Sequence, residues 1–272
     1  MPELPEVEFA RRSLVRWFEG RKLVRTESEP NTRTFRDSDL GIFAATKGSL
    51  DSATRKGKYL MLGFSSGLGA IAHLGMTGKF LKRKPSDEVR WSRARFFLDS
   101  GEVIHFQDPR MFGHIDALPA SELTKRKSVA KLGVDPLNDG LSVAQLKDAI
   151  GTSKQPLKVA LMDQERIAGL GNIHAAEALF RAKLHPSRTA DSLKPTEWTA
   201  LAKAIRDTIA FALKLDGESD EIEYVEEPGA KNPFFIYGRA GTPCRKCKTK
   251  VQSFTQGGRT THFCPKCQPR RG

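Results

Sequence analysis

Four cysteines near the C-terminal end of the sequence have the spacing of metal ligands. They form two C-x-x-C pairs, Cys244 with Cys247 and Cys264 with Cys267, and residues 248–263 separate the pairs. Thiolates in two close pairs suit a tetrahedral zinc ion, and four protein ligands leave no position open for a reactive water. Two disulfides are the alternative, which an intracellular location disfavours. We therefore predict one structural Zn²⁺ ion.

The segment between the two cysteine pairs is basic. It carries Lys248, Lys250 and Arg259, and the letters GGR at 257–259 predict the tip of a β-hairpin. A basic finger of this kind can contact a phosphate backbone.

The N-terminus, MPELPEVE, places two prolines and three carboxylates in the first eight residues. Pro5 suits the first position of a helix, and Glu6 and Glu8 favour the positive end of its dipole. A helix start therefore accounts for these three residues. It does not account for Pro2 and Glu3.

Two further segments carry residues that suit nucleic-acid binding. In GLGNIHAAEALF (169–180), glycines and Asn172 precede a periodic helix whose N-terminus can bind phosphate, with Lys158 nearby, although a simple helix cap is an equal alternative. In QDPRMFGHI (107–115), Arg110 and Phe112 share a face of an extended chain and can wedge into a base stack. A core phenylalanine beside a surface arginine is the alternative there.

Short apolar runs between turn signals indicate β-structure in the first half of the chain. The runs occupy residues 58–64, 69–76, 93–99 and 102–106, and DSG at 99–101 predicts a hairpin turn. Their spacing of roughly ten residues is typical of an antiparallel sandwich or barrel. We expect this domain to cover residues 1 to about 130, after a first helix that Gly20 ends.

Helical spacing of apolar residues replaces this pattern in the second half. It occurs over 141–150, 156–163, 173–183 and 195–215, which predicts a helical bundle. Residues 216–227, DGESDEIEYVEE, hold seven acids and are most simply a mobile, solvated loop. A tail rich in glycine, cysteine and arginine begins at about residue 234.

The composition limits the class of partner. The 272 residues include 45 Lys and Arg against 32 Asp and Glu, which gives a formal net charge of +13 and a pI of about 9.7. This charge favours a polyanion, with nucleic acid first and an anionic membrane surface second. No apolar run approaches the roughly 20 residues of a membrane-spanning helix, and the N-terminus lacks the pattern of a signal peptide. We expect a soluble, cytoplasmic protein of two domains.

These motifs, in this order, resemble the formamidopyrimidine-DNA glycosylase family, which shares a superfamily with endonuclease VIII. The resemblance covers nearly the whole chain. It rests on PELPEVE at 2–8, RKGKYL at 55–60, HLGMTG at 73–78, DPRMFG at 108–113, LMDQERIAGLGNIHAAEALFRAKLHP at 161–186 and YGRAGTPC at 237–244. The sequence departs from the family at His174, where Tyr is usual, and at 216–230, where the family's loop over the flipped base usually contains Gly, Ser and Arg.

The resemblance implies an α+β fold in three parts. They are an N-terminal catalytic β-sandwich with flanking helices over 1–131, a helix-two-turn-helix domain over 132–233, and a C-terminal zinc ribbon over 234–272. The partner implied is double-stranded DNA containing oxidised bases, bound by a monomer, with no role for a membrane.

The resemblance also accounts for Pro2 and Glu3. After removal of Met1, Pro2 becomes a secondary amine that attacks C1′ of the damaged nucleotide, expels the base and forms a Schiff base. Strand cleavage by β,δ-elimination follows. By the same resemblance, Glu3 protonates the sugar ring oxygen and Glu6 orients groups around the site.

Further residues match the DNA contacts of the family. Its phosphate contacts correspond to Lys58, His73, Asn172 and Arg259, of which we count Lys58 and Arg259 with the catalytic residues. Lys158 is expected to bind DNA beside Asn172. The trio that fills the space left by the flipped nucleotide corresponds to Met76, Arg110 and Phe112, with Arg110 facing the orphaned base.

We therefore expect a bifunctional DNA glycosylase and apurinic/apyrimidinic lyase of base excision repair. Its expected substrates are oxidised purines, namely 8-oxoguanine and formamidopyrimidines. One alternative is a glycosylase for oxidised pyrimidines like endonuclease VIII, against which PELPEVE and the trio of Met76, Arg110 and Phe112 argue. The other is a non-enzymatic binder of damaged DNA, against which the presence of Pro2, Glu3 and Lys58 argues.

Overall fold

The computed structural model describes residues 2–35, 38–216 and 221–270. The chain divides into two compact units. Unit 1 contains Met1–Lys131 and Asp216–Tyr224, and unit 2 contains Leu132–Leu215 and Val225–Gly272. An antiparallel sheet, a helical region and a C-terminal cysteine cluster make the fold α+β, as expected. Within the described ranges, no helix combines the length and apolar character that a membrane span requires.

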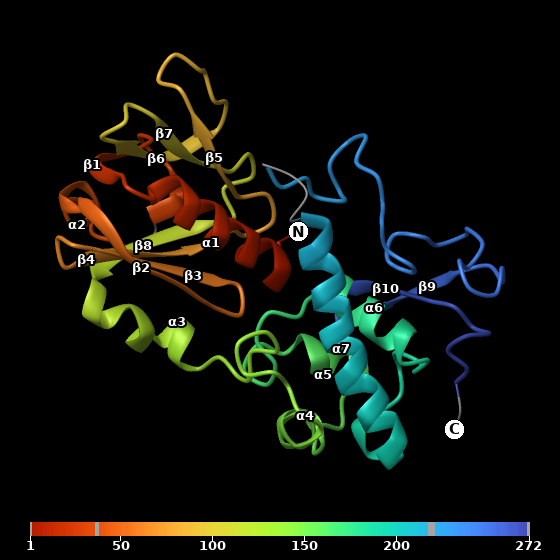
Figure 1. The fold of residues 1–272 in the computed structure, drawn as a ribbon. Helices are drawn as coiled ribbons and strands as arrows, with labels where there is room; N and C mark the ends of the chain where they lie inside the picture. The colour runs from red at the N-terminus through yellow and green to blue at the C-terminus, as the bar shows by residue number, and fades with distance from the viewer. Residues whose placement is uncertain (1, 36–37, 217–220, 271–272) are drawn as a thin grey trace. The chain divides into compact units, whose positions relative to one another are not determined.

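Unit 1 is built on an antiparallel sheet of eight strands in the order β5-β7-β6-β1-β2-β3-β4-β8 (Figure 1). The strands are β1 (Lys22–Ser28), β2 (Gly48–Lys56), β3 (Tyr59–Phe64), β4 (Leu68–His73), β5 (Lys79–Arg83), β6 (Ser92–Leu98), β7 (Val103–Gln107) and β8 (His114–Pro119). Only two residue pairs join β1 to β2, so the sheet can fold over at this point. One apolar core contains side chains from both halves, among them Phe96 and Phe106 from one and Leu60 and Leu62 from the other.

Four of the eight strands overlap apolar runs that the sequence predicted as β-structure. The runs at 58–64, 69–76, 93–99 and 102–106 overlap β3, β4, β6 and β7, and the turn at 99–101 joins β6 to β7. Gly101 in that turn has φ 86°, a conformation that favours glycine. The strands β1, β2, β5 and β8 were not predicted, because polar and charged residues interrupt their apolar positions.

Two helices flank the sheet of unit 1. Helix α1 (Leu4–Phe18) begins after Glu3 and ends before Gly20, which has φ 65°. Its buried face, which includes Val7 and Leu14, belongs to the same apolar core. Helix α2 (Leu40–Ala45) adds Phe43 to the same core. The shorter elements are η1 (Arg33–Phe35), η2 (Ala120–Lys125) and α3 (Lys127–Ala130).

The acidic segment 216–227 differs from its prediction where the structure describes it. Residues 217–220 lie outside the described residues. Beyond them, Ile222 and Tyr224 are buried against Phe9 of α1, and the Tyr224 hydroxyl donates to the Gly78 carbonyl at 2.6 Å. Glu221 forms an ion pair with Arg83. The expectation of a solvated loop was therefore wrong for residues 221–224, because two large side chains among the acids are buried in unit 1.

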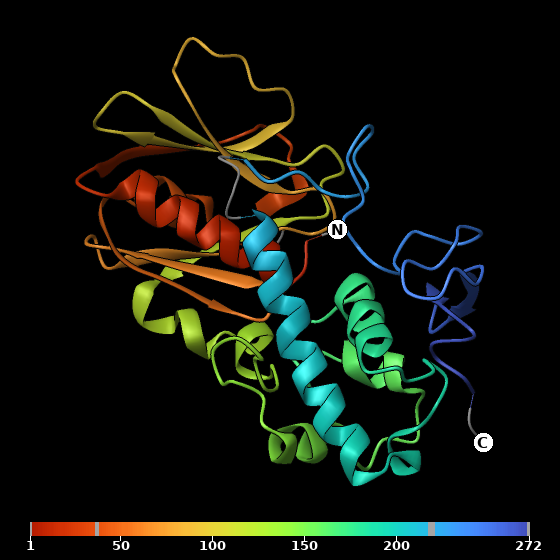
Figure 2. The ribbon, with the colours of Figure 1, turned by 45° about the vertical axis from the view of Figure 1, so that its right-hand side comes forward.

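Unit 2 contains four main helices and a two-stranded hairpin. They are α4 (Val143–Ile150), α5 (Leu157–Met162), α6 (Asn172–Arg181), α7 (Pro195–Asp216), β9 (Gln252–Gln256) and β10 (Arg259–Phe263), with η3 (Ala190–Ser192) before α7. Each helix overlaps one of the four predicted helical runs. Figure 2 shows α7 as the long cyan helix of this unit. The cysteine segment packs on α6, where Phe180 shares a buried cluster with Cys244 and Cys264.

Candidate functional site

The N-terminus of α1 brings Pro2, Glu3 and Glu6 together. All three are buried. The Glu3 backbone N–H donates to Glu6 Oε2 at 2.8 Å, and the Glu3 side chain accepts the backbone N–H of Glu6 in return. This reciprocal capping box fixes both carboxylates at the positive end of the helix dipole. The sequence therefore holds two acids in defined positions directly beside Pro2.

Lys58 lies in the two-residue turn between β2 and β3. The turn starts with Gly57 at φ 58°, which is typical of a tight hairpin. Arg55 donates to the Gly57 carbonyl at 3.0 Å, and its Nε lies 3.5 Å from Glu8 Oε2. Arg55 therefore ties the turn that carries Lys58 to the helix that carries Glu3 and Glu6.

Glu8 is ionised and holds Arg55 in this position. Burial raises the pKa of its carboxyl, but hydrogen bonds from Arg11 and Arg12 and the charge of Arg55 outweigh burial and lower the pKa below its usual value. The Arg11 Nη2 and Arg12 Nε atoms both lie 2.8 Å from Glu8 Oε1. The sequence predicts only that Glu8 favours the positive end of the helix dipole, because its partner Arg55 lies far along the chain.

His73 presents a neutral imidazole close to Lys58. Its ring stacks on His114 of β8, with centroids 5.3 Å apart and planes 9° apart. Burial, together with the charges of His114 and Lys58, lowers the pKa of His73 to about 3. The Gly75 N–H donates to His73 Nδ1 at 3.1 Å, so Nε2 carries the proton of the neutral ring. In unit 1, the charge of Lys58 therefore acts on His73, and the neutral His73 ring can donate a hydrogen bond from Nε2.

The buried carboxylate of Asp108 joins the loops that carry the predicted trio. Oδ1 accepts from the Thr77 hydroxyl at 2.6 Å and from the Arg110 N–H at 3.2 Å. Oδ2 accepts from the Gly113 N–H at 2.7 Å. The loop after β4 and the loop after β7 are thus held by one side chain. Asp108 was not among the predicted site residues, although Asp-Pro-Arg is a signal for a turn in which the Asp side chain accepts a backbone N–H.

The trio is divided between these two loops, with Met76 in the loop after β4 and Arg110 and Phe112 in the loop after β7. Gly75, next to Met76, has φ 64°, and a Cβ added there would lie 2.4 Å from the Gly113 nitrogen, so the loops touch. Phe112 is 46% exposed, and the Arg110 guanidinium lies 4.7 Å from the centre of its ring. The exposure of Phe112 excludes the alternative of a core phenylalanine.

In unit 2, Lys158 lies behind Asn172 in the interior. Asn172 is the first residue of α6, and Lys158 is only 1% exposed. The Lys158 ammonium donates to Asn172 Oδ1, to Thr261 Oγ1 at 2.8 Å and to the Thr260 carbonyl at 3.2 Å. Direct binding of DNA by Lys158 stays a prediction, and this geometry favours an indirect role.

Arg259 follows the tip of the β9–β10 hairpin, where the sequence predicted it. Gly257 and Gly258 form the turn, with φ 55° and 70°. Arg259 is exposed and pairs with Gln256 across the turn. Because Lys158 binds Thr260 and Thr261 as well as Asn172, one buried cation connects the two predicted phosphate contacts of unit 2.

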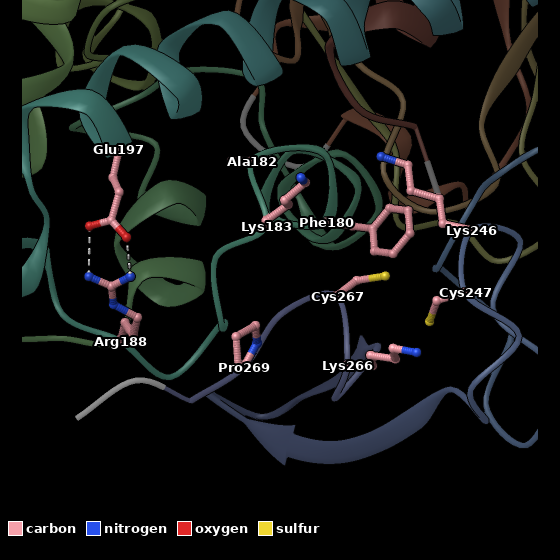
Figure 3. Close-up of a pocket in the computed structure, with 10 residues that line it drawn as sticks. All are labelled: Phe180, Ala182, Lys183, Arg188, Glu197, Lys246, Cys247, Lys266, Cys267 and Pro269. Atoms are coloured by element: carbon pink, nitrogen blue, oxygen red, sulfur yellow. Dashed lines mark hydrogen bonds and ion pairs between the residues drawn. The ribbon is translucent and has the colours of Figure 1, made fainter.

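The four cysteines form a thiolate cluster that fits zinc. Their sulfurs lie within 4.8 Å of one another, and the described ranges contain no second cluster of metal-ligating side chains. The Cys244–Cys267 and Cys247–Cys264 sulfur pairs are 4.0 and 3.4 Å apart. Sulfurs at about 2.3 Å from a tetrahedral zinc ion are separated by about 3.8 Å. Cys247 and Cys267 line a pocket together with Lys183, Lys246 and Lys266 (Figure 3).

Glu177 anchors the segment that leads into the cysteine cluster. Its buried carboxylate, on α6, accepts the backbone N–H groups of Phe235, Ile236 and Tyr237 at 3.1, 2.7 and 3.0 Å. One turn earlier on α6, the buried ring of His174 packs edge-on against Phe234 at 6.0 Å. Glu177 was not among the predicted site residues, because a buried acid whose partners are backbone groups leaves no complementary residue to recognise.

Three family models match consecutive parts of the chain. The formamidopyrimidine-DNA glycosylase N-terminal domain matches residues 1–115, and the H2TH domain of the same enzyme matches residues 132–223. A zinc finger found in FPG and IleRS matches residues 241–270.

Full-length relatives carry the same name. The formamidopyrimidine-DNA glycosylase of Heliobacterium modesticaldum is 36% identical over 277 residues, which cover 98% of this chain and 100% of that protein. The enzyme of Gluconobacter oxydans is 37% identical over 278 residues, with the same shares of both chains.

Solved structures agree with these relatives. MutM (Fpg) from Thermus thermophilus has a TM-score of 0.83 and 33% identity, with all of both chains covered. A MutM complex with DNA containing carbocyclic 8-oxo-G has a TM-score of 0.86 and 27% identity, with 99% of this chain and 100% of that chain covered.

Proposed function

Because the chain belongs to the formamidopyrimidine-DNA glycosylase family of base excision repair, we propose that it excises oxidised purines from double-stranded DNA and then cleaves the strand. The proposed substrates are 8-oxoguanine and formamidopyrimidines. A related MutM structure holds DNA with carbocyclic 8-oxo-G, and a Lactococcus lactis structure holds DNA with Fapy-dG. We propose that this enzyme acts as a monomer on chromosomal DNA.

The proposed nucleophile is Pro2. Once Met1 is removed, its nitrogen is a secondary amine that can attack C1′ of the damaged nucleotide and displace the base as the leaving group. The resulting iminium acidifies the neighbouring C–H bond, so loss of that proton breaks the adjacent C–O bond of the strand. Glu3 donates a proton to the sugar ring oxygen, and Glu6 holds the Glu3 backbone in place. The buried capping box of Glu3 and Glu6 beside Pro2 is the observation that carries this proposal.

The remaining residues are proposed to hold the distorted duplex. Lys58, His73, Asn172 and Arg259 bind phosphates around the lesion. Met76, Arg110 and Phe112 occupy the space that the extruded nucleotide leaves, which offsets part of the cost of unstacking. We propose that residues 1–131 form the catalytic part, residues 132–233 a DNA-binding part and residues 234–272 a zinc finger. Zinc bound by the four thiolates would keep the finger folded, because so short a ribbon buries little apolar surface.

Borohydride trapping tests the proposed chemistry. The chain without Met1 is incubated with duplexes that carry 8-oxoguanine, a formamidopyrimidine, an oxidised pyrimidine or no lesion, and the iminium is reduced to a stable amine. We expect adducts with the two purine lesions, and peptide mapping should locate them at Pro2. A matched chain with an N-terminal extension has an acylated Pro2 nitrogen and should give no adduct. Equal trapping by the extended chain, or adducts with the oxidised pyrimidine alone, would contradict the proposal.

A further inference from the structure

The described end of the acidic segment is attached along β5, which is first in the strand order of the sheet. Glu221 forms an ion pair with Arg83, the last residue of this strand. The ammonium of Lys79, its first residue, lies 6.0 Å from the centre of the Tyr224 ring. One residue before the strand, the Gly78 carbonyl accepts the Tyr224 hydroxyl at 2.6 Å. The segment is therefore held at both ends of β5.

Tyr224 contributes packing and a specific hydrogen bond at the same place. Its side chain is 4% exposed and packs against Phe9 and Ile222. A buried phenol needs an acceptor for its O–H group. The acceptor is the Gly78 carbonyl, 146 residues earlier in the chain. Phenylalanine could supply the packing, so the hydroxyl adds one function, which is to hold the backbone at Gly78.

Gly78 ends the turn that carries Met76. Its N–H donates to the Leu74 carbonyl at 2.8 Å, which closes residues 74–78 into a single turn. A Cβ added at Gly78 would lie 2.4 Å from the Leu74 oxygen and 2.9 Å from the Phe106 ring. The turn therefore packs directly on the core of unit 1, with Met76 at its middle.

Two side chains from distant parts of the chain hold this turn. Asp108 accepts the Thr77 hydroxyl at 2.6 Å, and Tyr224 donates to the Gly78 carbonyl. These contacts fix the two residues that directly follow Met76. A methionine side chain has three rotatable bonds, so the backbone beneath it decides which region the thioether can reach. The Tyr224 hydroxyl therefore acts on the placement of Met76 through two peptide units.

We propose that Tyr224 is a positioning residue for Met76. By holding the Gly78 carbonyl, its hydroxyl keeps the 74–78 turn in the orientation from which the methionine enters the space that the extruded nucleotide leaves. This inference rests on the proposed function, in which Met76 belongs to the trio that fills that space. It gives the acidic segment a task that depends on a neutral side chain and not on its charge.

A double-mutant cycle tests the positioning role. Parental protein, Tyr224→Phe, Met76→Ala and the double variant are mixed with a duplex that carries a stable abasic-site analogue beside 2-aminopurine, whose fluorescence rises when its neighbours unstack. We expect Tyr224→Phe to slow the rise about five-fold when Met76 is present and less than about two-fold in the Met76→Ala background. Equal slowing in both backgrounds, or a parental rate in Tyr224→Phe, would overturn the proposal.

Thr26→Val is the matched control for the lost hydroxyl. The Thr26 side chain, buried in β1, donates to the Phe43 carbonyl at 2.6 Å, the same type of acceptor at the same distance. Urea unfolding should show a loss of stability in both Thr26→Val and Tyr224→Phe, because each leaves a buried carbonyl without its donor. Only Tyr224→Phe should slow the fluorescence rise. Equal slowing by Thr26→Val would mean that general destabilisation causes the effect, and the proposal would fail.

The fluorescence signal is independent of the chemistry at Pro2, because the abasic-site analogue carries no base to excise. Failed borohydride trapping together with intact coupling between Tyr224 and Met76 would support the positioning role and refute only the proposed chemistry. Successful trapping without that coupling would refute only the positioning role.

Discussion

The buried ammonium of Lys158 donates a hydrogen bond to Asn172 Oδ1 and thereby links the start of α5 to the start of α6. The same ammonium binds the Thr260 carbonyl and the Thr261 hydroxyl of β10. Asn172 and Arg259 are the two phosphate contacts proposed for unit 2. Asn172 accepts a hydrogen bond from the Lys158 ammonium directly, and Arg259 is adjacent to Thr260, whose carbonyl accepts another. Lys158 therefore positions both contacts without reaching the surface.

Replacement of Lys158 should destabilise the protein. Lys158→Met leaves the Asn172 and Thr261 oxygens without their donor, and each buried acceptor left unpaired costs about 1–3 kcal/mol. Lys154→Met is the matched control, because Lys154 is exposed and its 3.2 Å ion pair with Asp191 is screened by solvent, so its loss should change stability little. Urea unfolding of both variants measures the difference.

The salt dependence of DNA binding separates the two roles of Lys158. A positioning residue lowers affinity through the displaced Asn172 and hairpin, so the loss should accompany the loss of stability. A direct phosphate contact would instead reduce the salt slope by about one while the unfolding free energy stayed close to parental. The second pattern would show that Lys158 reaches DNA after all.

The sequence reveals those features whose cause is local or whose residues form a motif. The start of α1 follows from Pro5 and Glu6, and the β9–β10 turn follows from Gly257 and Gly258, because each depends on neighbouring residues. The α+β fold was accessible through the resemblance, which covers nearly the whole chain. The thiolate cluster was accessible from cysteine spacing alone.

The features that could not be predicted from the sequence depend on partners far along the chain. Asp108 accepts from Thr77, and Glu177 accepts backbone N–H groups almost sixty residues later, so no local pattern marks either acid. The composition of residues 216–227 predicts a solvated block that includes Ile222 and Tyr224, because acids dominate this segment. Their burial against Phe9 depends on the tertiary fold.

His73 should make the protein less stable in acid. Its folded-state pKa of about 3 lies below the value of about 6.5 for an unfolded chain, so between these values only the unfolded state binds the proton. The contribution of His73 to the free energy of unfolding is fully present above about pH 6.5. It falls as the pH decreases toward 3, by at most about 2 kcal/mol at pH 5. His73→Asn, whose Oδ1 can still accept the Gly75 N–H, should lose less stability between pH 7 and pH 5. Identical losses in both proteins would show that His73 already titrates normally.

Zinc should support both the finger and its DNA contact. Metal analysis should find about one zinc per chain, held by four thiolates. Cys244→Ser or removal of the metal should weaken DNA binding through loss of the ribbon, which circular dichroism of the β9–β10 region and thermal unfolding can follow. Parental affinity after complete removal of zinc would contradict this expectation.

Arg259 should act through its charge at the hairpin tip. Arg259→Ala should reduce the slope of log affinity against log salt by about one, because one phosphate contact is lost. Arg259→Lys keeps the charge and should keep most of the slope. If Arg259→Ala preserved the parental slope, the exposed side chain would not contact the backbone in the complex.

Arg110 should set the preference for the base opposite the lesion. A guanidinium has donors only, so it pairs best with a base that presents acceptors. Cytosine presents O2 and N3, whereas adenine presents N1 beside a donor amine, and one bidentate contact is worth roughly 1–3 kcal/mol of discrimination. Arg110→Ala should therefore erode the preference for cytosine over adenine by about ten-fold.

Phe112→Ala is the matched control for Arg110, because the two side chains contact each other on one loop. A wedge responds to stacking and not to base identity, so this variant should slow excision opposite cytosine and adenine by the same factor. Single-turnover excision of 8-oxoguanine opposite each base measures both ratios. An Arg110→Ala enzyme that kept the parental ratio would mean that the guanidinium supports the Phe112 ring without reading the orphaned base.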